Sequence, residues 1–106
     1  METTAIAKTC IDSGNSKIIY HCVDALGYYI AQGSGGEPSK IVSGCRDIKN
    51  EDGAAQCIAA AVGELIFQDY AGWQEAVEET CNSLSGLYQT ACYERIEQVK
   101  QSYGRS

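Results

Sequence analysis

The sequence contains few of the residues that would point directly to a site. It has one proline, one histidine and no Cys-x-x-Cys motif, so we expect neither a zinc site nor any other metal site. Basic residues are also scarce, and the formal net charge is −6. This charge argues against nucleic acid or an anionic membrane as partner, because both attract Lys/Arg clusters. No apolar run reaches the ~18 residues that a membrane span needs.

The cysteines indicate an oxidising compartment, whereas the N-terminus does not have the pattern of a signal peptide. Six cysteines in 106 residues is an even and unusually high number, which predicts a disulfide framework and an oxidising compartment. The N-terminus METTAIAKTC, however, has no basic region followed by an apolar stretch, and the sequence has no Asn-x-Ser/Thr sequon. We therefore expect an extracellular or periplasmic mature protein to which an initiator Met has been added.

The cysteines follow a regular period. The first members of three pairs are separated by 35 and 36 residues (Cys10, Cys45, Cys81), and the second members by 35 and 35 (Cys22, Cys57, Cys92). A fixed period of this length indicates stacked supersecondary units. We interpret residues 1–106 as one domain with internal repeats at approximately 1–35, 36–71 and 72–106.

The sequence of each repeat predicts a helix, a short turn and a second helix. The expected fold is therefore all-α with about six helices. The first helix is expected at Thr4–Cys10, and Ser16, Asn50 and Ser85 are the expected N-caps of the second helix in each unit. The fifth helix carries Trp73, Ala76, Val77, Cys81 and Leu84 at helical spacing. Gly33-Ser34-Gly35-Gly36 is expected to be a flexible connector between units. Local pairing follows from the repeat: Cys10–Cys22, Cys45–Cys57 and Cys81–Cys92, giving three disulfide-linked hairpins.

The stretch Cys57 to Tyr70 is the most apolar helical segment. Its apolar residues follow the i, i+1, i+4, i+5 pattern and extend around the cylinder through Ala59, Ala60 and Phe67. A helix that is apolar on most sides is normally buried. We expect this helix to be central, with the other segments packed on it and Ala71-Gly72 at its end.

The run LGYYIAQGSG, with Leu26-Gly27, Gly33 and Gly35, resembles the LG-x-x-Y-x-x-G-x-G run of the Sel1-like repeats, a disulfide-pinned class of α-hairpin repeat. The tetratricopeptide pattern has a similar period and fits less well. The resemblance covers one unit and departs from the family at Ile30, where the family has an aromatic residue. It implies an interaction scaffold and assigns no functional residue.

Catalytic chemistry has little support in the sequence. His21 and Asp24 lie three residues apart and could begin an acid–base pair, but no nucleophile is evident beside them. We interpret them as an ordinary helix pair. The acidic residues Glu75, Glu78 and Glu79 are interpreted as a solvated helix face. We expect no enzyme activity and no cofactor.

Tyrosine is the residue in surplus, with seven copies. Tyrosine suits interfaces, because it buries a large ring and keeps a polar tip. Our candidate binding residues are Tyr20, Tyr28, Tyr29 and Trp73. We expect a secreted binding module that recognises a protein or peptide through a helical face. The alternative is a carrier of a small apolar ligand in a pocket between hairpins, and a secreted effector or toxin role is compatible with either.

Overall fold

The protein is all-α along its described length, as the apolar periodicity predicts. The computed structural model describes residues 16–48 and 50–104, so the predicted helix Thr4–Cys10 lies outside the described residues. Five helices follow in order: α2 (Ser16–Ser34), α3 (Pro38–Arg46), α4 (Glu51–Phe67), α5 (Trp73–Asn82) and α6 (Gly86–Tyr103). Two of the three predicted hairpins, α3–α4 and α5–α6, are therefore described in full.

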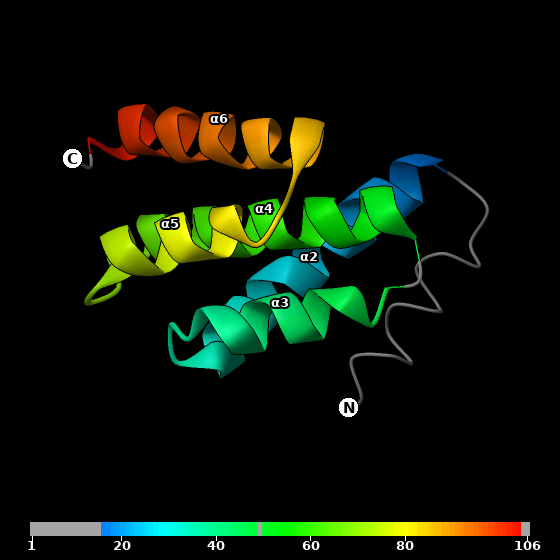
Figure 1. Cartoon of the computed structure of the whole chain (residues 1–106), viewed down its shortest axis with the longest axis horizontal. Coiled ribbons are helices and arrows are strands. Elements are labelled where there is room, and N and C mark those ends of the chain that lie inside the picture. The colour runs from blue at the N-terminus through cyan, green and yellow to red at the C-terminus, as the bar shows by residue number, and fades with distance from the viewer. Residues whose placement is uncertain (1–15, 49, 105–106) are drawn as a thin grey trace.

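The helices stack in two layers, which Figure 1 shows from one side. Helices α2, α4 and α6 lie next to one another in one layer, and α3 and α5 lie next to each other in the other. Further contacts join α3 to α4 and α5 to α6 within hairpins, and α2 to α3 and α4 to α5 between them. The two described hairpins thus pack on each other, and the first of them also packs on α2.

Helix α4 is central, as its composition predicts. It contacts each of the other four described helices. Its residues Cys57, Ile58, Ala60, Ala61, Val62 and Ile66 are all 0% exposed. On α6, Cys92, Ile96 and Val99 are buried, whereas Ala91 is exposed.

The C-terminus of α4 differs from the prediction. The helix ends at Phe67 rather than at Tyr70, because Asp69 adopts a left-handed conformation (φ 51°). The backbone N–H of Asp69 donates to Ile66 and that of Tyr70 donates to Leu65, which is the Schellman pattern. Aspartate is one of the few residues besides glycine that adopts this conformation readily. The expected stop at Ala71-Gly72 is therefore wrong by three residues, and Phe67 is left at the helix end.

Asn50 caps α4 as predicted, with its side-chain oxygen accepting from the N–H of Gly53 at 2.8 Å. Ser85 holds the same position before α6, but its side chain makes no cap hydrogen bond. We expect Asn50→Ala to lower the free energy of unfolding by about 1 kcal/mol, whereas Ser85→Ala should change it by only a few tenths. Urea unfolding of both variants measures this difference. Equal effects would show that the Asn50 side chain does not cap the helix.

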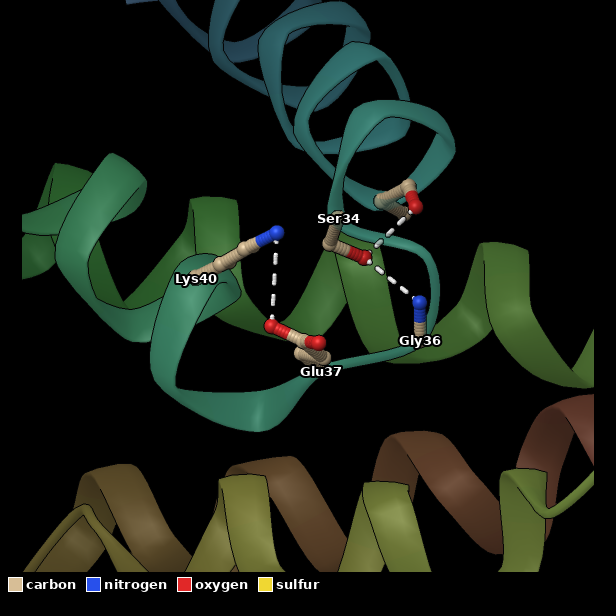
Figure 2. A network of polar contacts seen from close by, with 5 residues as sticks. Ser34, Gly36, Glu37 and Lys40 are labelled. Carbon is tan, nitrogen blue, oxygen red and sulfur yellow. Dashed lines mark hydrogen bonds and ion pairs between the residues drawn. The ribbon is translucent and has the colours of Figure 1, made fainter.

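The connector between α2 and α3 is a hydrogen-bonded turn rather than a loose linker. Ser34 is buried, and its hydroxyl donates to the carbonyl of Ala31 at 2.7 Å and accepts from the N–H of Gly36 at 3.0 Å (Figure 2). Gly35 and Gly36 have φ values of 64° and 81°, which glycine adopts without strain. A salt bridge between Lys40 and Glu37 follows at 3.4 Å on the surface. The end of α2 is thus held in place.

Two disulfides have the predicted local pairing. Cys45–Cys57 joins the last turn of α3 to the second turn of α4, and Cys81–Cys92 joins α5 to α6 in the same way. Their sequence separations are 12 and 11 residues. The predicted Cys10–Cys22 bridge includes Cys10, which lies outside the described residues.

Candidate functional site

Three helices of one layer meet at a hollow near the C-terminal ends of α4 and α6. We call it the aromatic hollow, and its volume is about 280 Å³. Helix α2 contributes one tyrosine, α4 contributes the floor, and α6 contributes the opposite side. The lining residues are Tyr28, Gly63, Glu64, Phe67, Arg95, Val99 and Tyr103.

The hollow contains an aromatic pair on its rim. The rings of Phe67 and Tyr103 pack edge to face, with centroids 4.7 Å apart and an interplanar angle of 62°. Both side chains stay well exposed, at 45% and 51%. Such exposure leaves apolar ring surface that a partner could cover, and aromatic side chains are enriched at protein interfaces for this reason.

Helix α6 approaches α4 through Arg95. A β-carbon on Gly63 would lie 3.2 Å from Nε of Arg95 and 3.5 Å from Cγ2 of Val99, so the arginine side chain lies directly over the α4 backbone. At the corresponding contact between α2 and α4, a β-carbon on Gly27 would lie 2.7 Å from Cβ of Ala60. Ala60 and Arg95 each follow the second cysteine of their unit by three residues. At the α2–α4 contact, the small residue Ala60 thus faces Gly27. At the α4–α6 contact, the cationic side chain of Arg95 faces Gly63.

The two charged groups of the hollow have different surroundings. The carboxylate of Glu64 accepts a hydrogen bond from Nε2 of Gln68 at 2.9 Å. Arg95 is partly buried, and no carboxylate of the described residues lies within ion-pair distance of it. The hollow therefore offers apolar rings beside a cation that has no ion-pair partner among the described residues.

The structure separates the three tyrosines that the sequence singles out. Tyr28 lines the aromatic hollow, whereas Tyr29 lines a different hollow of about 460 Å³ between α2 and α3, together with Lys40. Tyr20 is half exposed and packs edge to face on His21, with ring centroids 5.6 Å apart. Consecutive residues of a helix point about 100° apart, which is why Tyr28 and Tyr29 line different hollows.

Trp73, the fourth candidate, is a core residue. It is 4% exposed, and its Nε1–H donates to Asp69 at 3.0 Å. This hydrogen bond links the start of α5 to the turn that ends α4. We therefore leave Trp73 out of the candidate site.

His21 and Asp24 do not form an acid–base pair in the structure. The Asp24 carboxylate accepts a hydrogen bond from Nε2 of Gln56 at 3.2 Å, and the same amide nitrogen donates to the carbonyl of Tyr20 at 2.7 Å. His21 is exposed. Asp24 thus helps to join α2 to α4 rather than to orient the imidazole.

Tyr88 has a clearly shifted pKa. Its hydroxyl donates to Asp52 at 2.5 Å, and this hydrogen bond is the main cause that raises the pKa of Tyr88 to about 12. Desolvation and the negative charges of Asp52 and Glu51 act in the same direction. The hydrogen bond from the phenol links α6 to the start of α4.

Residues 16–48 and 50–104 hold neither a metal-binding cluster nor a membrane span. Across these ranges, no three His, Cys, Asp or Glu side chains gather in a way that could hold a metal ion. None of the described helices combines the length and the apolar character that crossing a bilayer requires.

Comparison with protein-family models, with curated proteins and with solved structures finds no match to this sequence. The function is therefore inferred from the protein's own geometry.

Of the seven residues that line the hollow, only Tyr28 was predicted as a site residue, so Phe67, Arg95 and Tyr103 were missed. The sequence spacing does not mark the contact between Phe67 and Tyr103, because these residues are 36 apart whereas Cys57 and Cys92 on the same two helices are 35 apart. It does not mark Arg95 either, since the residue 35 positions earlier is Ala60.

Proposed function

We propose that this protein is a helical binding module that recognises a protein or peptide partner at the aromatic hollow. The observation that carries the proposal is the convergence of Tyr28, Phe67 and Tyr103 from three helices around one hollow. Aromatic anchors that converge from a rigid scaffold are typical of interaction surfaces. The residues that line the hollow include no set of nucleophile and base, so we propose binding rather than catalysis.

The dimensions favour a partner side chain over a small carried ligand. Pockets for small molecules usually measure ~300–1,000 Å³ and bury most of the ligand. The aromatic hollow, at about 280 Å³, is slightly smaller and lies open on the surface. A hollow of about 910 Å³ lies along α6, but most of its lining residues are polar or charged, including Glu94, Glu97 and Gln98. Neither hollow suits an enclosed apolar cargo, so the carrier remains the second candidate.

The scaffold that we propose is a short array of disulfide-linked hairpin repeats, as the resemblance to Sel1-like repeats implies. Stacking of α2, α4 and α6 in one layer and of α3 and α5 in the other supports it. Two intramolecular disulfides support an oxidising location, extracellular or periplasmic. A scaffold of this kind holds residues of successive units on one surface.

Removing two rings of the hollow should weaken the capture of a partner that binds there. We expect the Tyr28→Ala/Tyr103→Ala variant, used as bait in a pull-down from the native source, to lose at least one partner that the wild type retains. Truncation of a hot-spot aromatic typically costs about 2 kcal/mol or more of binding free energy, or roughly a thirtyfold loss in affinity. Quantitative mass spectrometry of the eluates measures the difference.

Tyr20→Ala/Tyr29→Ala is the matched control. It also removes two rings, and both tyrosines are half exposed, at 50% and 52%, but lie outside the aromatic hollow. The control should retain the wild-type partners. If instead the control loses them and the folded hollow variant keeps them, the aromatic hollow is not the binding site.

A further inference from the structure

The cation of the aromatic hollow contrasts with the basic residues that form ion pairs elsewhere in the described structure. Lys40 pairs with Glu37 and Lys100 pairs with Glu97, each at 3.4 Å and each within one helical turn. Arg95 has no such partner among the described residues, although acidic residues outnumber basic ones fourteen to eight in the sequence. Its side chain lies across Gly63, beside exposed rings. The site therefore combines apolar surface with a positive charge that has no ion-pair partner among the described residues.

We infer that the aromatic hollow binds a peptide segment in which an apolar side chain stands directly beside a carboxylate, such as a peptide C-terminus with an apolar last residue. The inference rests on the proposed function and names the chemistry of its partner. Phe67, Tyr103 and Tyr28 cover the apolar side chain, and Arg95 receives the carboxylate.

Arginine suits this role because its planar guanidinium matches the two oxygens of a carboxylate. Partial burial beside Gly63 lowers the local dielectric and strengthens the pairing relative to a fully exposed lysine. Glu64 stands in the same hollow and is already held by Gln68. The negative charge of Glu64 disfavours a peptide that brings more than one carboxylate. The hollow therefore selects a segment with one anionic group next to apolar surface rather than a strongly acidic segment.

The test compares two peptides that differ only in the terminal charge, acetyl-Ala-Leu-Phe with a free carboxylate and the same peptide as its C-terminal amide. Titration of the ¹⁵N-labelled full-length protein should shift the amides of Gly63, Phe67, Arg95 and Tyr103. We expect the carboxylate peptide to bind about five- to tenfold more tightly than the amide. This ratio should fall as salt is added, because the charge is partly exposed.

Arg95→Gln should remove the preference and leave both peptides at the affinity that the wild type has for the amide. Arg46→Gln is the matched control: it makes the same charge change on the exposed face of α3, outside the hollow, and should keep the preference. Circular dichroism checks that both variants are folded. Should Arg95→Gln fail to fold, the wild type still tests the inference, through the ratio of its affinities for the two peptides and the dependence of that ratio on salt.

Equal binding of the two peptides by the wild type, or no shift at the hollow with either one, would overturn the inference. Loss of the preference in Arg46→Gln would overturn it as well. The proposed function fails by a different result, namely unchanged partner capture by the Tyr28→Ala/Tyr103→Ala variant. The two failures are therefore distinguishable.

Discussion

Replacing Cys45 and Cys57 together by alanine is expected to lower the free energy of unfolding by about 3 kcal/mol. The bridge closes a loop of 12 residues between α3 and α4, and both cysteines are 0% exposed. In the chain-entropy account, its loss frees the unfolded polypeptide and so favours unfolding. For a domain that is stable by ~5–15 kcal/mol, this is a large share. Guanidinium unfolding followed by circular dichroism measures it.

Cys81→Ala/Cys92→Ala is the comparison. Its loop is nearly the same length, at 11 residues, so loop closure predicts nearly the same cost. A much larger cost for the first pair would show that packing around α4, rather than loop closure, dominates. An unchanged unfolding midpoint for either variant would contradict the stabilising role given to its bridge.

Gly27→Ala is expected to destabilise the protein by about 1–3 kcal/mol through overpacking. A β-carbon at this position would lie 2.5 Å from the carbonyl oxygen of Cys57 and 2.7 Å from Cβ of Ala60. These are backbone and short side-chain atoms of the central helix, so α2 must move away to admit the methyl group. Alanine favours a helix over glycine by ~1 kcal/mol, and this gain offsets only part of the cost.

Gly33→Ala in the same helix is the control. A β-carbon there meets nothing within 4 Å, so only the helix propensity changes and stability should rise by up to ~1 kcal/mol. Thermal unfolding of the two variants should therefore move in opposite directions. Equal midpoints would show that α2 and α4 do not approach closely at Gly27.

Features determined by nearby residues were predictable from the sequence. Asn50 caps α4 because its side chain reaches the N–H of a residue three positions later. Pro38 begins α3 because the first helical turn needs no N–H from it. The pairs Cys45–Cys57 and Cys81–Cys92 followed from the period and from the short distance across one hairpin.

Features determined by packing between helices were not predictable. Trp73 and Tyr28 are both large aromatic residues at helical positions, yet one is in the core and the other is on a hollow. Only the contacts that α5 and α2 make with the other helices decide between these outcomes. Phe67 became part of the site because its ring packs on Tyr103 of α6, a contact between helices that the neighbouring residues in the sequence do not specify.

The most direct measurement for the proposed binding role is chemical-shift mapping of the ¹⁵N-labelled protein with a partner recovered by the wild-type bait. If the aromatic hollow is the site, the largest shifts will lie at Tyr28, Gly63, Phe67, Arg95 and Tyr103, which lie on three separate helices. Shifts confined to the α3–α5 layer, or to Tyr20 and Tyr29, would contradict the account.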